Sequence, residues 1–460
     1  MLSRRKRNIG LALALLLCAL GICLVVGGAL SGHSPDAVSR AYAATGQEAS
    51  SARQALEAAA PLASGDALQA QTAKKVKKAK PAKPTAKQLK AFKKASADFS
   101  IQLFQRCVAA KGKNANVTVS PMSVMNALAV TANGAAGKTA AQMRKVIGGG
   151  ASQARINKNL SWYNSKLVNS KKARLKSANA LWYHECDTLK MKKAFVSTVR
   201  RAFNANVQSA DFANPATVDS INAWAADNTD NMIKRIVGQL QPEDRLVIAN
   251  ALCFDAEWLT PYDKGSVRKA AFHAANGKKR KVDMMYGTEQ SYIETDNATG
   301  FIKPYAKGYS YVALLPNKGM NAKSYVASLT GDSFRKAIAG AKRAVVRTGL
   351  PKYSLDYDND NMQSQLAAMG MPQAFAPNAN FSKMGKDTSG NLYLGQVVHK
   401  TKIDVDEQGT KAAAVTAVFV KASSAFIGDV KSVVLDRPFV YAIVDNATKL
   451  PIFIGTVSDL

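Results

Sequence analysis

The spacing of apolar and polar residues divides the chain beyond residue 88 into alternating helices and strands. Residues 89–110 place apolar side chains at helical spacing, and the pair Ser120-Pro121 starts a second helix that we predict over residues 120–132. Apolar, β-branched runs predict four strands, over residues 245–254, 312–315, 439–444 and 452–457. The polar residues 445–449 predict a hairpin turn between the last two strands. No segment repeats at a fixed period, so the pattern indicates an α+β domain.

Length and composition fit one large domain over residues 89–460. The chain has 460 residues, of which 47% are hydrophobic, enough for a sizeable core. Cys107, Cys186 and Cys253 lie in this domain without the spacing of a metal site or of a disulfide framework. We expect all three to be buried small hydrophobic residues.

Residues 1–30 have the pattern of a targeting segment. Four basic residues at positions 4–7 precede an uncharged apolar run over residues 9–30. The run is long enough to span a bilayer, and a small-residue cleavage pattern occurs only later, at residues 41–43. A cleaved signal peptide and a retained N-terminal membrane anchor both fit. Either one predicts an extracytoplasmic protein, secreted or anchored to the outer face of the cell membrane.

Residues 31–88 are rich in Ala, Ser, Gln, Lys and Pro and poor in aromatic residues, which predicts a disordered stalk. The net charge of the chain is +31, and residues 1–88 contain 13 Lys or Arg and 4 Asp or Glu, so +9 belongs to this part and +22 to the domain. The basic segment 74–83 is either a solvated spacer or a contact for an anionic cell wall or membrane surface. Basic segments at 171–176 and 278–281 could bind a polyanion. They lack interleaved aromatic residues, so we expect no nucleic acid as partner.

The sequence contains no recognisable catalytic motif. The domain has three histidines, His184, His273 and His399, and no G-x-S-x-G segment that would supply an activated serine. Nucleotide-binding and HExxH metal motifs are absent from the sequence as well. We therefore expect no enzymatic activity, no catalytic residue, no metal and no cofactor.

Residues 406–418 are suited to exist both as a loop and as a strand. They begin with acidic residues, pass through Gly409, where φ is unrestricted, and continue with small and β-branched residues. With strand alternation, one face would carry Thr410, Ala412, Ala414, Thr416, Val418 and Val420. Lys411 and Lys421 fall on the opposite face and can stay in water. From the pattern alone, an ordinary alanine-rich loop or edge strand remains the alternative.

Several segments in this chain resemble those of the serpin family, in the family's order. They are residues 116–123 (NVTVSPMS), 133–139 (NGAAGKT), 178–182 (ANALW), 250–254 (NALCF), 283–285 (DMM), 350–353 (LPKY), 366–371 (LAAMGM), 381–384 (FSKM), 399–400 (HK), 436–441 (DRPFVY) and 453–457 (FIGTV). The hinge of the serpin reactive-centre loop is similar to Glu407, Gln408, Gly409, Thr410, Lys411, Ala412, Ala413 and Ala414. The resemblance extends over roughly residues 89–460.

The resemblance implies the serpin fold, with three β-sheets, eight or nine helices and an exposed reactive-centre loop. It also implies a gate where the central sheet opens. In the family, the counterpart of His399 forms hydrogen bonds inside this sheet, with partners that correspond to Ser120, Ser123 and Asn250. Trp258 matches a tryptophan at the top of the sheet, where the hinge enters.

The activity that the resemblance implies is irreversible inhibition of an extracellular serine protease by a monomeric suicide substrate. The protease attacks the loop, forms an acyl-enzyme, and is trapped when the cleaved loop inserts into the central sheet. Family spacing predicts the reactive bond at Ser423-Ser424, with Ala422, Ala425 and Phe426 as alternatives. A shorter downstream arm would move it near Ile427. A small residue at this bond suits elastase-like or subtilisin-like proteases, whereas a trypsin-like one would need cleavage after Lys421.

Two hinge residues depart from the family pattern: Lys411 stands where an acidic residue is usual, and Val415 where a small one is. Both fall on the solvent face, so we expect neither to block insertion. The alternative function is a non-inhibitory serpin that acts as a polyanion- or ligand-binding surface protein. The small, uncharged residues at Thr410, Ala412 and Ala414 favour inhibition.

Overall fold

The computed structural model describes residues 81–112, 114–241, 244–359, 362–395, 397, 399–410 and 430–460. The predicted leader, most of the predicted stalk, hinge residues Lys411 to Ala414 and the bond Ser423-Ser424 lie outside the described residues. Within the described residues, no helix is both long and apolar enough to cross a membrane.

The described part of the chain contains nine α-helices. They are α4 (Ala86–Ala110), α5 (Pro121–Ala132), α6 (Gly137–Gly148), α7 (Gln153–Lys166), α8 (Lys193–Phe203), α9 (Pro215–Asn228), α10 (Ala322–Ser328), α11 (Gly331–Ala339) and α12 (Met362–Ala368). Two short 3₁₀ helices accompany them, η1 (Lys264–Ser266) and η2 (Pro372–Phe375). The number agrees with the predicted eight or nine helices.

The described strands form three sheets, as predicted. The central sheet has the order β11 (Tyr353–Asn359), β13 (His399–Val405), β14 (Gly409–Thr410), β5 (Leu246–Glu257), β2 (Ala173–His184) and β4 (Asn206–Ala210). The largest sheet has the order β1 (Val117–Val119), β17 (Pro451–Val457), β16 (Phe439–Asp445), β9 (Tyr309–Pro316), β8 (Ala298–Pro304), β7 (Lys279–Glu294), β10 (Lys342–Pro351) and β15 (Val430–Val434), with β6 (Val267–His273) also paired to β7. The third pairs β12 (Gly385–Asp387) with β3 (Leu189–Met191).

Local sequence signals set the first two helices. Helix α4 begins at Ala86, three residues before the predicted start, because Thr85 and Gln88 form a reciprocal capping box. Helix α5 begins at Pro121 and is capped by the Ser120 hydroxyl, which accepts a hydrogen bond from the backbone N–H of Ser123. The predicted second helix is therefore confirmed.

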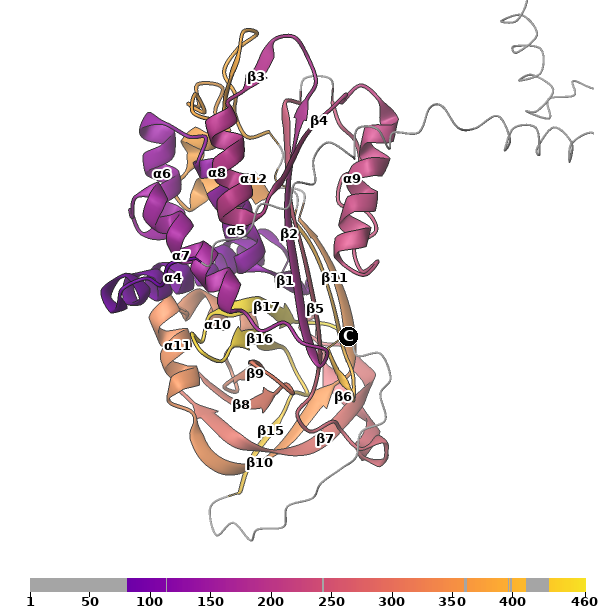
Figure 1. The fold of residues 1–460 in the computed structure, drawn as a ribbon. Coiled ribbons are helices and arrows are strands. Elements are labelled where there is room, and N and C mark those ends of the chain that lie inside the picture. The colour runs from indigo at the N-terminus through magenta and orange to yellow at the C-terminus, as the bar shows by residue number, and fades with distance from the viewer. Residues whose placement is uncertain are drawn as a thin grey trace, which may run out of the picture. The chain divides into compact units, whose positions relative to one another are not determined.

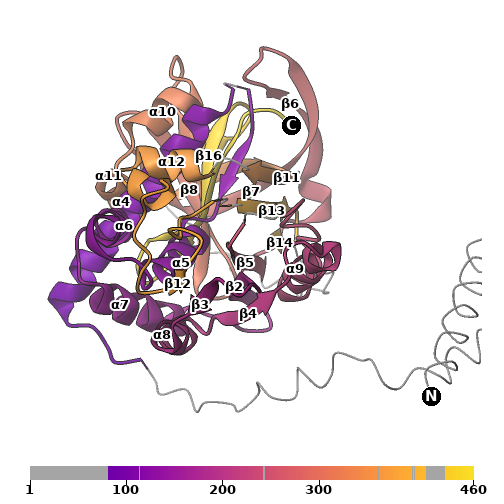
Figure 2. The same ribbon diagram turned by 90° about the horizontal axis from the view of Figure 1, so that it is seen from above.

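Helices cover both faces of the central sheet. Strands β2 and β5 lie between α5 on one side and α9 on the other (Figure 1, Figure 2). The side chains of β5 alternate accordingly. Leu252 belongs to the main core. Ala249 packs in a smaller cluster with Trp182, which lies on β2, and Ile221, which lies on α9.

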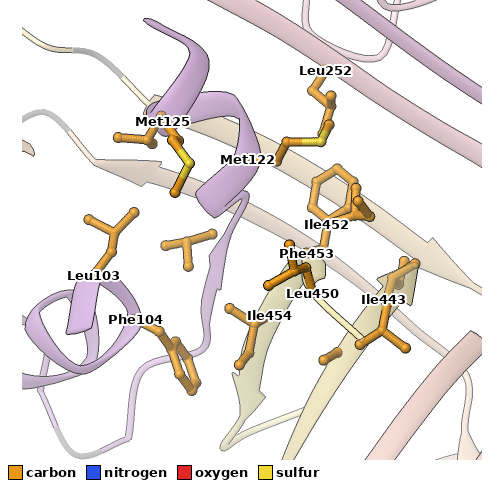
Figure 3. Packing of buried hydrophobic residues seen from close by; sticks show 14 of the residues in the cluster. Leu103, Phe104, Met122, Met125, Leu252, Ile443, Leu450, Ile452, Phe453 and Ile454 are labelled. Atoms are coloured by element: carbon orange, nitrogen blue, oxygen red, sulfur yellow. The ribbon is translucent and has the colours of Figure 1, made fainter. Parts of the chain in front are cut away.

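The main core joins α4 and α5 to the C-terminal strands. Phe104, Met122 and Leu252 pack around β16 and β17, whose residues are buried along their whole length (Figure 3). Of the cysteines, Cys107 and Cys253 are buried as expected, but Cys186 is only half-buried, because it lies in the short turn between β2 and β3. This core fixes the position of β5, from which the candidate site extends.

Candidate functional site

The first part of the hinge lies inside the central sheet. Strand β14 pairs antiparallel with both of its neighbours: Gly409 is opposite Glu257, and Thr410 is opposite Ala256 on β5 and Val405 on β13. Among the described residues, β5 and β13 pair with β14 and not with each other. If this register continued beyond Thr410, a longer β14 would lie between these two strands.

Gly409 is required here by a close approach. A Cβ atom at this position would lie 2.0 Å from the carbonyl oxygen of Ala256, inside any van der Waals contact. Gly409 is not among the residues with positive φ. The glycine therefore serves chain packing against β5 at this position, whereas the sequence suggested conformational freedom.

Thr410 is buried, and its hydroxyl contacts one of two stacked aromatic residues. Its side chain is 1% exposed, and its hydroxyl lies 2.5 Å from the hydroxyl of Tyr305. The ring of Tyr305 stacks on Trp258, with centroids 4.4 Å apart and planes 12° from parallel. Burial raises the pKa of Tyr305 well above its usual value, so its hydroxyl stays protonated and can form this hydrogen bond.

Residues 258–262, which we call the hinge cradle, hold three successive carbonyl groups of the hinge. The indole Nε1 of Trp258 donates to the oxygen of Asp406 at 2.9 Å, and its backbone N–H donates to that of Gln408 at 2.8 Å. The backbone N–H of Tyr262 donates to the oxygen of Glu407 at 2.9 Å. The predicted gate residue Trp258 therefore contacts the hinge directly.

The turn between β13 and β14 is closed by Asp406. Its carboxylate accepts hydrogen bonds from the backbone N–H groups of Gln408 and Gly409, at 2.8 and 3.1 Å. Its own backbone N–H donates to the oxygen of Gly409 at 3.0 Å. The neighbouring Glu407 forms an ion pair with Lys352, 2.8 Å away. Partial burial works to raise the pKa of Glu407, but the hydrogen bond and charge of Lys352 outweigh it and lower that pKa.

His399 links β13 to the start of α5. The backbone N–H of Ser120 donates to Nε2 of His399 at 3.1 Å, and the Ser120 hydroxyl donates to the oxygen of Ile452 at 2.8 Å. Because Nε2 accepts a hydrogen bond, the neutral ring carries its proton on Nδ1. Burial lowers the pKa of His399 to about 4, against a smaller opposing effect of Asp358.

Asn250 does not join this group. Its side-chain amide donates to Asn179 on β2 at 2.8 Å, whereas the structure joins His399 to Ser120 and, through the Ser120 hydroxyl, to Ser123. Among the described residues, β5 and β13 do not pair with each other, and the side-chain amide of Asn250 turns to the neighbouring strand β2 instead.

Three residues of the site were not assigned a role from the sequence. Lys352 was seen only as part of a family motif, and neither Tyr262 nor Tyr305 was singled out. For Tyr305, the sequence shows only that it follows Pro304 at the end of an apolar strand. That position does not indicate that its hydroxyl bonds to a residue 105 positions later.

The basic segment 171–176 is largely paired with acidic side chains. Its ion pairs are Lys172 with Glu257, Arg174 with Asp255, and Lys176 with Asp230. In the second basic segment, Arg280 pairs with Asp459 at 2.7 Å. These contacts reduce the charge that either segment can offer to a polyanion.

Comparisons with known proteins agree with this arrangement. The family described as Serpin (serine protease inhibitor) matches residues 94–460. An uncharacterized serpin-like protein of Thermococcus kodakarensis is 31% identical in an alignment of 380 residues that covers 80% of this chain and 85% of that protein.

Among solved structures, the native state of the thermophilic serpin tengpin is 42% identical, with a TM-score of 0.77 that covers 83% of this chain and 96% of that one. Its latent state gives a TM-score of 0.72 at 41% identity, covering 82% of this chain and 99% of that one. Human thyroxine-binding globulin, complexed with thyroxine, is 25% identical with a TM-score of 0.72, over 81% of this chain and 99% of that one. With the family matched over the whole of residues 94–460, this chain belongs to the serpins, which in general inhibit proteases.

Proposed function

We propose that the protein is an irreversible suicide-substrate inhibitor of serine proteases, which traps the acyl-enzyme by inserting its cleaved loop into the central sheet. The observation that carries this proposal is the pairing of Gly409 and Thr410 between β5 and β13. Insertion would lengthen a strand that already exists. If the register of β14 continued, Ala412 would lie opposite Phe254 on β5 and Ile403 on β13. Ala414 would then lie opposite Leu252 and Thr401.

The energy of such insertion is large enough to drive trapping. Roughly 14 inserted residues, at about 1 kcal/mol for each net hydrogen bond, contribute on the order of 10 kcal/mol before side-chain burial is added. The form with the loop outside the sheet is then metastable and persists because of a kinetic barrier. Cleavage of the loop removes that barrier.

The chemistry belongs to the protease. Its serine oxygen attacks the carbonyl carbon of Ser423, an ester forms, and the peptide bond breaks so that the amine of Ser424 leaves with the proton delivered by the protease histidine. Hydrolysis of this ester would release the enzyme. Insertion of the segment beyond Thr410 carries the enzyme, still ester-linked to Ser423, away from the position where it first bound and distorts its site before water reacts.

Elastase-like and subtilisin-like enzymes are the proposed targets, since their shallow specificity pockets accept a small residue such as Ser423. The apolar leader supports action outside the cytoplasm, either as a secreted protein or on the outer face of the membrane. We propose that the inhibitor acts as a monomer and needs no cofactor. We propose a polyanion as an additional partner for the basic segments 74–83 and 278–281, since among the described residues Arg280 forms the one ion pair found in the second of them, whereas most of segment 171–176 is ion-paired.

The test is incubation of the purified protein with pancreatic elastase, subtilisin, trypsin and chymotrypsin, followed by denaturing gels and intact-mass measurement. An SDS-stable adduct with elastase or subtilisin, and a released C-terminal peptide that begins at Ser424, is the expected result. Cleavage without any adduct, and without a gain in thermal stability of the cleaved protein, would instead identify a non-inhibitory serpin.

A further inference from the structure

A buried lysine lies directly beneath the hinge cradle. Lys303 is on β8, and its side chain is 4% exposed. Its Nζ lies 2.8 Å from Oε1 of Glu289 on β7, whose side chain is 10% exposed. Removing two charges from water is costly, and the ion pair alone rarely makes up for it. The position of Lys303 is therefore better explained by its other contacts.

Those contacts all reach the cradle. The ammonium group of Lys303 donates to the carbonyl oxygen of Thr260 at 2.9 Å. It also lies over the ring of Tyr262, 4.1 Å from the centroid, and 5.4 Å from the ring of Trp258. One cation thus contacts the middle and both ends of residues 258–262 through a charge-assisted hydrogen bond and two cation–π interactions.

The cradle in turn fixes the hinge. Trp258 and Tyr262, the two residues whose rings Lys303 contacts, are the residues that bind the carbonyl groups of residues 406–408. An apolar side chain could fill the volume of Lys303, but it could not bind the Thr260 carbonyl or attract both rings. Glu289 supplies the negative charge that pairs with Lys303. Burial raises the pKa of Glu289, and the charge and hydrogen bond of Lys303 oppose this rise.

We propose that Lys303 is a positioning residue for loop insertion: by anchoring the hinge cradle it holds β14 in the register from which the cleaved loop enters the sheet. The role in insertion rests on the proposed inhibitory function. After cleavage, insertion competes with hydrolysis of the acyl-enzyme. A cradle that is free to move delays the first inserted pairs, and more of the inhibitor is released as cleaved substrate.

The test is the double variant Lys303→Met/Glu289→Met, which removes the cation without leaving a buried carboxylate unpaired. Its matched control is Lys342→Met/Glu294→Met, the same chemical change at an ion pair of 3.0 Å that joins β10 to β7 with side chains 69% and 49% exposed. Both variants are compared with the parent in two measurements. One is hydrogen exchange of the Trp258 and Tyr262 amides, and the other is the number of inhibitor molecules consumed for each protease molecule inactivated.

We expect the first variant to speed amide exchange at Trp258 and Tyr262 at least tenfold and to raise the consumed ratio at least threefold, while the control changes neither. Unchanged exchange in a folded variant would overturn the anchoring by Lys303. Faster exchange with an unchanged ratio would overturn its role in insertion. If the parent itself forms no stable adduct, the inhibitory function fails, and the exchange measurement still decides whether Lys303 anchors the cradle.

Discussion

The hydroxyl of Thr410 lies 2.5 Å from the hydroxyl of Tyr305, at a point where the hinge has already entered the central sheet. Thr410 is 1% exposed, and the ring of its partner Tyr305 is itself buried and stacked on Trp258. Two consequences follow for the inhibitor. Under the proposed mechanism, the first step of insertion is completed before a protease arrives, and the residue at this step must be small and uncharged.

We therefore predict that Thr410→Arg turns the inhibitor into a substrate. A guanidinium group at this buried position has no partner, so residue 410 leaves the sheet and insertion loses its starting pair. Denaturing gels with the target protease should contain cleaved protein and no adduct. Thr410→Val is the control, because it keeps the size and leaves only the Tyr305 hydroxyl unpaired, at a cost of about 1 to 3 kcal/mol. Undiminished inhibition by Thr410→Arg would contradict the insertion mechanism.

Gly409→Ala should displace β14 from β5, because the new methyl group meets the carbonyl oxygen of Ala256 at 2.0 Å. We expect faster hydrogen exchange of the Thr410 amide and a larger fraction of cleaved inhibitor. Gly112→Ala makes the same chemical change where a Cβ atom meets nothing within 4 Å. Equal behaviour of the two variants would show that the close approach at Gly409 has no effect on insertion.

Lys411→Glu tests the register. If the register of β14 continues by one residue in the cleaved protein, residue 411 comes opposite Asp255 on β5 and Asp404 on β13. A glutamate there faces two like charges, at a cost of about 1 kcal/mol, or roughly a fivefold slower insertion. The measured quantity is again the inhibitor consumed per protease inactivated, and Lys411→Gln should give an intermediate value. A ratio for Lys411→Glu at or below that of the parent would rule out this register.

Lowering the pH should reduce the free energy of unfolding, because His399 takes up a proton more readily in the unfolded chain. Its pKa is about 4 in the folded protein and about 6.5 in an unfolded chain, so the folded state binds the proton less readily. The stabilisation is complete above pH 6.5 and is lost as the pH falls from 6.5 to 4, by about 3 kcal/mol in total. Denaturant unfolding of the native form at pH 7 and at pH 4 measures this loss. The side chain in His399→Gln can still accept the Ser120 hydrogen bond but does not titrate. Between pH 7 and pH 4 this variant should therefore lose about 3 kcal/mol less unfolding free energy than the parent. The same pH dependence in both proteins would exclude His399 as the cause.

Much of the fold followed from local signals in the sequence. Strand β5 was predicted to end at residue 254 and ends at Glu257, because its ladder with β2 continues through Ala256 and Arg174 pairs with Asp255. Such an extension through polar residues depends on a partner strand about 80 residues away. Periodicity within one segment does not contain that information.

The same limit applies to the site. The hinge was recognised in the sequence because its residues are contiguous, and Ser120 and His399 were associated through the family resemblance. The bond from Asn250 to Asn179, the ring stack of Tyr305 on Trp258 and the burial of Lys303 all depend on contacts between distant strands. From the sequence alone, a lysine in an apolar strand is assigned to a sheet edge or a solvent-facing position, because lysines are rarely buried.

The turn that Asp406 closes between β13 and β14 would give the proposed inhibitor a kinetic advantage. Since these two strands are antiparallel and joined by three residues, they are the closed end of a β-hairpin, and insertion is the lengthening of that hairpin. The slow part of hairpin formation is nucleation of the turn, and here it is complete in the uncleaved protein. Once the peptide bond breaks, one arm of the hairpin remains to be lengthened, and no search for a distant partner strand precedes it. Complete formation of a small hairpin, turn included, takes about 1 to 10 μs.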